Sequence, residues 1–169
     1  LAEYRRVVGT AAKVMLDDGL PTSLDVSEVA NTTVGSTNVI KGYCGRVGQG
    51  DKVPFVALAT DKFDGDLVIW IDSQGKSQLF DASGKPIAAV QKLLDAGKAV
   101  VGCDPLMIGE AVPGTGQPAR GVNEGFPGYT FCYNRPLIAE QVRDVLTIAG
   151  SALSRPEIRS VHLVATGDA

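Results

Sequence analysis

Val161-His162-Leu163-Val164-Ala165-Thr166-Gly167-Asp168-Ala169 is an apolar run of strand length that ends in small residues. In an α/β protein, a parallel strand ending in such a turn places the start of the next helix over the carboxyl edge of the sheet, where ligands bind. The sequence stops where that helix would begin. A buried parallel strand without a covering helix leaves apolar surface exposed. We therefore expect an incomplete fold, truncated after this strand, with further polypeptide packed beside residues 161–164.

Length and composition favour a globular chain with a substantial core. The chain has 169 residues, of which 44% are hydrophobic, and this fits one domain. The net charge of −3 and the absence of a Lys/Arg run argue against a nucleic-acid partner. No apolar segment approaches the roughly 18 residues that a membrane span requires. We expect one incomplete domain over 1–169, with a leading helix (1–23), antiparallel strands (24–65) and a parallel β/α part (66–169).

The cysteine pattern indicates neither a metal site nor a complete disulfide framework. The chain has three cysteines, Cys44, Cys103 and Cys132, and no C-x-x-C spacing. Cys44 and Cys103 lie in apolar runs, where cysteine packs as a small hydrophobic residue. No metal ion and no cofactor is therefore expected.

The first 60 residues predict a helix followed by antiparallel strands. Apolar residues at helical spacing over 2–16 predict an amphipathic helix, which Asp18-Gly19 and Pro21 would end. Short β-branched runs over 26–34, 38–47 and 53–59 predict three strands. The sequence Gly48-Gln49-Gly50-Asp51 is typical of a hairpin turn.

From residue 66 the pattern becomes that of a parallel sheet. Leu67-Val68-Ile69-Trp70-Ile71 is a continuous apolar run, typical of a strand buried on both faces. After a loop over 72–85, Pro86 is expected in the first turn of a helix that ends at Gly97, and the next strand covers 99–103. This is a βαβ unit, which should be right-handed. Pro136 is expected to open a second helix before the last strand.

Several phrases after residue 66 carry a family resemblance. They are Val68-Ile69-Trp70-Ile71, Gly75-Lys76, Leu79-Phe80-Asp81, Leu93-Leu94-Asp95-Ala96-Gly97, Tyr129-Thr130-Phe131-Cys132-Tyr133-Asn134-Arg135-Pro136 and Arg143-Asp144-Val145-Leu146-Thr147. With them, residues 66–169 resemble bacterial α/β-hydrolases of the acetylxylan-esterase-like or dienelactone-hydrolase-like kind.

The resemblance implies an α/β-hydrolase sheet and a carboxylic-ester hydrolase, present here as its amino-terminal half. It implies a small-molecule or carbohydrate ester as the substrate, and the remaining polypeptide of the same fold as a partner. It favours a periplasmic or secreted location.

In this family the nucleophile occupies a strained strand-to-helix turn of the pattern small-x-nucleophile-x-small. In Ala165-Thr166-Gly167-Asp168-Ala169, Gly167 takes the nucleophile position but has no side chain that can attack. A shift by one residue would place Asp168 there, and a carboxylate can act as a covalent nucleophile. The alternative is a turn that ends a strand and has no covalent role. The 169-residue chain alone is expected not to hydrolyse esters.

The oxyanion hole of this family uses two backbone N–H groups, one after the nucleophile and one from the loop after an earlier strand. By position these are Asp168 and either Ser73 or Gln74. The alternative is that Asp72-Ser73-Gln74-Gly75 is an ordinary surface turn. The family often has His-Pro where this chain has Asp72-Ser73.

We predict that the loops after three parallel strands leave the sheet at one edge, because parallel strands end on the same side. The only histidine, His162, is interpreted as an ordinary strand residue, and Arg135 and Asp144 as structural partners. Two other function classes remain: a non-catalytic hydrolase-fold binding domain, and a nucleotide-binding domain disfavoured by the lack of G-x-G-x-x-G after a strand. The residues that we expect to converge at the edge where these loops leave the sheet are Asp72, Ser73, Gln74, Asp104, Thr166, Gly167 and Asp168.

Overall fold

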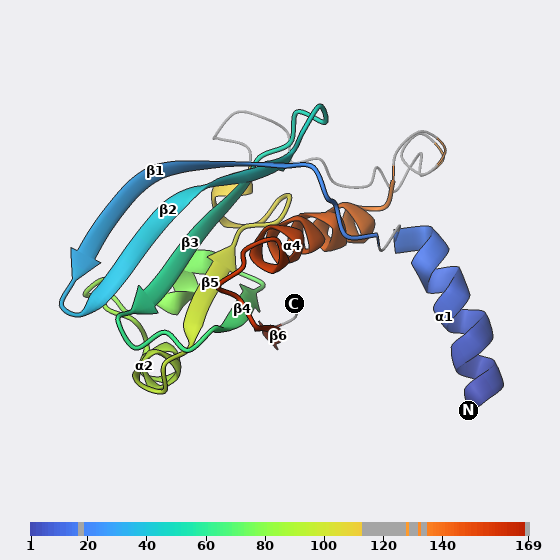
Figure 1. The fold of residues 1–169 in the computed structure, drawn as a ribbon. Helices are drawn as coiled ribbons and strands as arrows, with labels where there is room; N and C mark the ends of the chain where they lie inside the picture. Colours follow the sequence, from blue (N-terminus) through green and yellow to red (C-terminus); the bar gives the residue numbers. More distant parts are fainter. Residues whose placement is uncertain (17–18, 113–127, 129–131, 133–134, 168–169) are drawn as a thin grey trace.

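The computed structural model describes residues 1–16, 19–112, 128, 132 and 135–167, and its largest element is a mixed six-stranded sheet. The strand order is β1-β2-β3-β5-β4-β6 (Figure 1). Helices and 3-10 turns connect the strands. The strands are β1 (Leu24–Val34), β2 (Thr37–Arg46), β3 (Val53–Thr60), β4 (Asp66–Asp72), β5 (Ala99–Cys103) and β6 (Ser160–Thr166). The helices are α1 (Ala2–Leu16), α2 (Ala88–Asp95) and α4 (Leu137–Leu153), with 3-10 turns η1 (Lys76–Leu79) and η2 (Gly109–Ala111).

The pairing directions agree with an antiparallel front followed by parallel strands. β1 pairs with β2, β2 with β3 and β3 with β5, all antiparallel. The central strand β4 pairs in parallel with β5 on one side and with β6 on the other, so that Val68 lies between Val100 and His162. This α/β arrangement places the ends of β4, β5 and β6 at the same edge of the sheet.

Alternate side chains of the parallel strands pack on opposite faces of the sheet. Leu67 and Ile69 of β4 join a core cluster with Ile148 and Ala152 of α4. Val68 of β4 joins another cluster, which contains Val90 and Leu94 of α2. The continuous apolar runs of the sequence therefore reflect a sheet covered by a different helix on each face.

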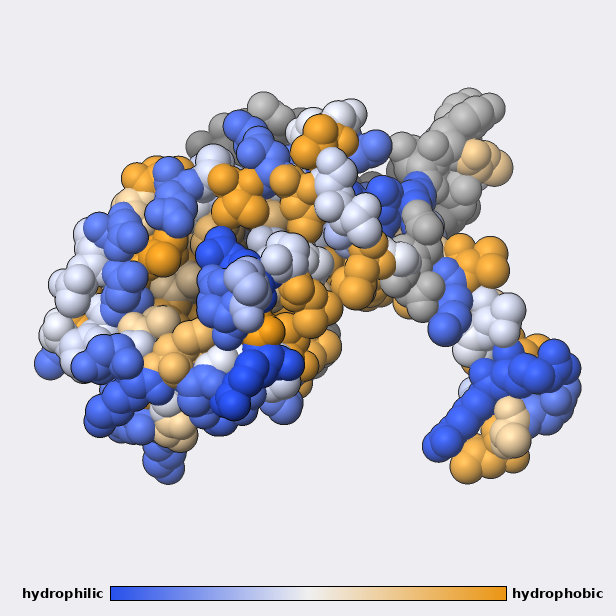
Figure 2. Space-filling view, viewed as in Figure 1, coloured by the Kyte–Doolittle hydropathy of each residue, from blue (hydrophilic) through white to orange (hydrophobic). Residues whose placement is uncertain are grey.

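Helix α1 has the predicted bounds, but little of its surface packs against the rest of the chain. It has no buried residue, and Figure 1 shows it extending away from the sheet. Its surface shows both hydrophilic and hydrophobic residues in Figure 2, and Tyr4, Val7 and Val14 are exposed. No helix in the described part of the chain is both long enough and apolar enough to cross a membrane.

Two local expectations need correction, and a third is confirmed. Pro86 does not lie in the first turn of α2: it forms a β-bridge with Phe80, and Ile87 is extended, so the helix begins at Ala88. Pro136 is the N-cap residue of α4, which begins at Leu137, so the prediction that it opens this helix is confirmed. The loop over 72–85 contains the 3-10 turn η1.

The strand β6 is parallel, as expected, but the described residues do not bury it on both faces. It pairs with β4 and lies at the edge of the sheet. Leu163 is 61% exposed, and His162 and Ala165 are exposed as well. The apolar run thus predicted a parallel strand, whereas the burial of its side chains depends on what packs beside it.

Candidate functional site at the carboxyl edge of the sheet

The ends of β4 and β6 are joined by a chain of polar contacts. The Thr166 hydroxyl donates to Asp72 Oδ2 at 2.7 Å and accepts a hydrogen bond from the Trp70 indole N–H at 3.1 Å. All three residues belong to neighbouring parallel strands in register, with Asp72 opposite Thr166. The structure thus places Asp72 and Thr166 side by side at this edge, and their part in a pocket stays a prediction.

The turns that follow these two strands also meet. Gly167 has a φ of +70°, a left-handed conformation that side chains other than glycine rarely adopt. A Cβ atom added at Gly167 would lie 2.5 Å from Ser73 Oγ and 3.8 Å from the Ser73 backbone nitrogen. The position that the family pattern assigns to the nucleophile therefore lies against Ser73. Asp168 lies outside the described residues.

Replacing Gly167 with alanine is expected to lower the free energy of unfolding by about 1–3 kcal/mol from backbone strain, with a further loss from the contact with Ser73 Oγ. In a Ser73→Ala background the further loss should disappear, because the remaining Ser73 Cβ would lie at an ordinary 3.5 Å. Urea unfolding of the two single variants and the double variant measures this coupling.

Gly84→Ala is the matched control for this cycle. Gly84 also has a left-handed φ, +78°, but an added Cβ would meet nothing within 4 Å. Its substitution should cause the backbone loss alone and show no coupling to Ser73. Equal coupling at Gly84 and Gly167 would contradict the contact between the two turns.

Of the two sequence-predicted donors on the 73–74 turn, the geometry favours Ser73. The Gln74 backbone N–H donates to Asp72 Oδ1 at 2.8 Å, and the Gly75 N–H donates to the Asp72 carbonyl at 2.9 Å. Asp72 thus folds the turn with its side chain and its carbonyl, which is a common use of Asp after a strand. A Gln74 N–H engaged in this way is not directed at a ligand.

Asp104 reaches the same edge but has a structural environment. The residue is 2% exposed. Its carboxylate accepts three hydrogen bonds, from Lys76 N at 2.6 Å, Lys76 Nζ at 2.5 Å and Glu110 N at 2.9 Å. Gly75 and Gly109 leave the space that it occupies, since a Cβ on Gly75 would lie 2.5 Å from Asp104 Oδ1. Asp104 therefore clamps the loop after β4 to the loop after β5.

A pocket shared by Asp104, Asp72 and Thr166 stays a prediction. In the described residues, Asp104 contributes to the wall of a cavity of about 340 Å³ with Lys41, Phe80 and Glu110. Asp72, Ser73 and Thr166 are not among the residues that line it. A strand end fixes the edge at which a side chain emerges, but the following turn decides its direction. Sequence reasoning gave no role to Lys76, which it named only in the phrase Gly75-Lys76, or to Glu110.

His162 has contacts that support its interpretation as an ordinary strand residue. Its Nε2 lies 3.0 Å from Ser160 Oγ, and the Ser160 hydroxyl donates to Asp66 Oδ1 at 2.8 Å. In a catalytic triad the carboxylate binds the histidine, whereas here it binds the serine. Asp66 also pairs with Lys98 Nζ at 2.5 Å, and this pairing holds the pKa of Asp66 below its usual range. The group lies where β4 and β6 begin, at the opposite edge from Thr166.

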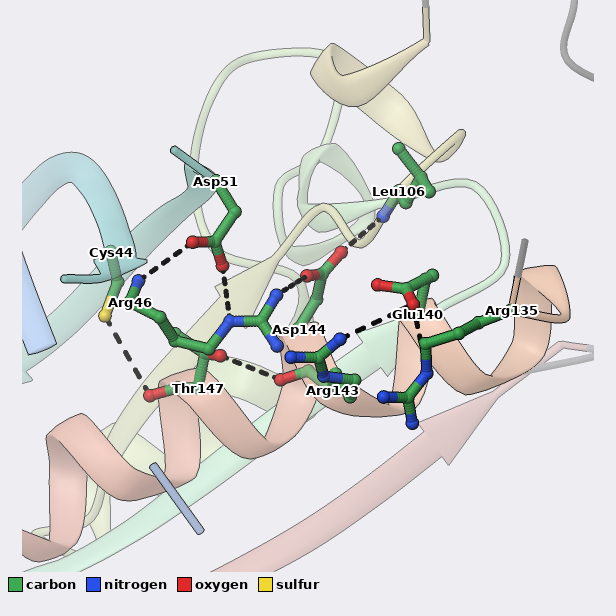
Figure 3. A network of polar contacts seen from close by, with 9 residues as sticks. All are labelled: Cys44, Arg46, Asp51, Leu106, Arg135, Glu140, Arg143, Asp144 and Thr147. Carbon is green, nitrogen blue, oxygen red and sulfur yellow. Dashed lines mark hydrogen bonds and ion pairs between the residues drawn. The ribbon is translucent and has the colours of Figure 1, made fainter. Parts of the chain in front are cut away.

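A second polar network ties α4 to the antiparallel strands (Figure 3). Arg46 Nε donates to Asp51 Oδ2 at 2.6 Å, and Arg46 Nη2 lies 3.9 Å from Asp144 Oδ1. Asp144 Oδ2 accepts the Leu106 N–H at 2.8 Å, so one carboxylate of α4 contacts both the β2 end and the loop after β5. The interpretation of Asp144 as a structural partner fits these contacts. Arg135 pairs with Glu140 at 3.2 Å.

Burial raises the pKa of Asp144, against the lowering effects of the Leu106 N–H and Arg46. Between the ordinary value near 3.9 and the raised value, the folded chain binds more protons than the unfolded chain, so this group makes stability fall as pH rises through that window. We expect Asp144→Asn, which keeps an acceptor for Leu106, to remove this contribution. Urea unfolding is measured from pH 4 to 8. The free energy of unfolding of the variant should rise relative to that of the wild type as pH rises, and a constant difference between the two proteins would contradict the prediction.

The cysteines agree with the packing interpretation. Cys44 and Cys103 are buried free thiols, and Cys132 is exposed. Burial raises the pKa of both buried thiols, that of Cys103 to about 12. Within the ranges that the structure covers, no group of three or more His, Cys, Asp or Glu side chains is placed to hold a metal ion.

Comparison with known proteins adds a fold-level likeness. No family model and no curated protein matches the sequence. The structure is similar to a candidate acetyl xylan esterase from Bacteroides fragilis, with 12% identity, a TM-score of 0.68, and coverage of 97% of this chain and 46% of that one. It is also similar to an acetyl xylan esterase from Paenibacillus sp. R4, with 12% identity, a TM-score of 0.58, and coverage of 96% and 51%. The chain therefore spans about half the length of these structures and is similar to them in fold over that part.

Proposed function

We propose that this chain is the amino-terminal half of an α/β-hydrolase of the carboxylic-ester type, acting on small-molecule or carbohydrate esters. The observation that carries the proposal is the contact between the two turns at the carboxyl edge. Gly167, with its φ of +70°, lies against Ser73, and Thr166 binds Asp72. A nucleophile turn beside the loop after an earlier strand is the arrangement from which this fold builds an oxyanion hole.

In this proposal, backbone N–H groups bind the substrate at the site. The N–H groups of Ser73 and Asp168 would bind the carbonyl oxygen of an ester, and Gln74, whose N–H is held by Asp72, would contribute less. Backbone donors do not depend on side chains, so they serve whether or not Gly167 stands in the nucleophile position. Thr166 and Asp72 hold the two turns together. The Asp104 clamp holds the Ser73 loop from its other side.

Turnover in this fold requires a nucleophile and a histidine base, and the described residues of the proposed site do not provide this pair. Gly167 offers no nucleophilic atom, and His162, the only histidine, lies near the opposite edge. We propose that further polypeptide packs beside β6, where Leu163 is 61% exposed, and completes the fold. The chain alone should then release no chromogenic alcohol from a short acyl ester above the buffer rate. Turnover lost in Asp168→Asn and kept in Ser73→Ala would instead favour Asp168 as the nucleophile.

The second proposal is a non-catalytic domain that uses the same edge for binding, and the missing side chain at Gly167 favours it. Amide chemical shifts of Ser73 and Gly167 during titration with an acetylated xylo-oligosaccharide separate the two. A hydrolase-type pocket should prefer the acetylated ligand to the unacetylated one, because the oxyanion donors bind the ester carbonyl. Equal binding of both supports the non-catalytic domain, and no shift with either contradicts both.

A further inference from the structure

A cavity of about 130 Å³ lies between the sheet and the second half of α4. Its walls come from β2, β3 and β5 on one side and from α4 on the other, through residues such as Ile40, Phe55, Val101 and Ile148. Protein interiors are packed densely, with few voids larger than a water molecule. A space of this size in the core cluster of α4 therefore needs a specific cause.

The cause is a pairing of small side chains across the interface. Ala57 of β3 and Ala152 of α4 both line the cavity, so neither the strand nor the helix fills the space between them. Phe55, another residue of the wall, lies against Gly42 of β2, because a Cβ added at Gly42 would come within 3.1 Å of the Phe55 ring. The Phe55 ring thus lies over a glycine, on the same wall that Ala57 leaves open.

The chemistry of the walls selects the kind of ligand. Aliphatic and aromatic side chains form most of the walls, and apolar cavities of similar size bind small apolar molecules: one of about 150 Å³ holds benzene. The charged residues Glu28, Arg155 and Glu157 line the same space, and all three are exposed. Arg155 Nη1 lies 3.8 Å from Glu157 Oε1, and with Glu28 the rim carries two negative charges and one positive charge. The rim therefore disfavours an anion.

We infer that this cavity is a binding site for a neutral single-ring aromatic molecule, separate from the proposed ester site. It lies toward the amino edge of the parallel strands, since Leu67 at the start of β4 and Ile158 just before β6 line it. The turns of Ser73 and Gly167 follow the opposite ends of those strands. A ring of six carbons enters beside the charged rim and packs between Phe55, Ala57 and Ile148.

Benzene is the probe, and nuclear magnetic resonance of the folded chain is the measurement. Benzene should shift the signals of Val101, Ile148 and Ala152 along saturable curves and raise the melting temperature, while benzoate at equal concentration should shift them far less. Ala57→Ile fills the space with a β-branched residue suited to a strand, and should abolish the benzene shifts in a protein at least as stable as the wild type.

Two further variants keep the test decisive. Ala152→Leu fills the cavity from the helix side and should also abolish binding, so a folding defect in one filling variant leaves the other. Ala89→Leu adds the same volume at an exposed position of α2 and should leave the benzene curves unchanged. The inference is overturned if the folded wild type shows no saturable shift up to the solubility of benzene, or if a folded filling variant binds as the wild type does.

Discussion

Replacing Asp104 with alanine is expected to lower the free energy of unfolding by about 3–5 kcal/mol, the range for breaking a buried ion pair from one side. The substitution leaves the Lys76 ammonium buried without its 2.5 Å partner, and it removes the acceptor of two backbone N–H groups, those of Lys76 and Glu110. Glu110 Oε1 lies 3.1 Å from Lys76 Nζ and recovers part of the loss. Urea unfolding measures the difference.

Asp81→Ala is the matched control for Asp104. Asp81 also accepts two backbone N–H groups, from Ser83 and Lys85, but it lies on an exposed turn. Water replaces its lost bonds, so the decrease should stay near 1–2 kcal/mol. A second comparison is Lys76→Met, which keeps both backbone bonds and should cost less than Asp104→Ala. An Asp104→Ala decrease no larger than that of Asp81→Ala would contradict the clamp.

The second large effect is expected for Leu58→Ala, at about 2–5 kcal/mol. Leu58 is fully buried in the centre of β3, opposite Val100 of β5 and Val39 of β2, and belongs to the cluster beneath α2. The loss combines the transfer of the leucine side chain with a cavity that the rigid sheet cannot close. Chemical denaturation followed by circular dichroism gives the value.

Leu163→Ala removes the same side-chain atoms as Leu58→Ala, but at the edge of the sheet. Leu163 is exposed on β6, so its truncation should change the free energy of unfolding by no more than about 0.5 kcal/mol. Similar decreases for the two leucines would mean that Leu163 is covered in solution, and would locate the polypeptide that we propose beside β6. A small effect at Leu58 would place β3 outside the core.

The sequence by itself determined the elements and their directions. The continuous run 67–71, the helix before Gly97 and the run 99–103 required a parallel unit, because strands that are apolar on both faces must lie between two layers. Parallel pairing then placed Asp72 and Thr166 at one edge, as the 2.7 Å contact between them bears out. The glycine turn at 48–51 likewise determined the antiparallel pairing of β2 with β3.

Only the tertiary structure decided how side chains at that edge are used. Asp72 and Asp104 occupy similar positions in the sequence, at or just after the end of a strand. Yet Asp72 accepts a hydrogen bond from Gln74 in its own turn, whereas Asp104 is buried and binds Lys76. The cavity beneath α4 is equally invisible in the sequence, since Ala57 and Ala152 are ordinary residues until β3 and α4 face each other. Local patterns report the backbone, because its hydrogen bonds are periodic, whereas the partner of a side chain is set by segments distant in the chain.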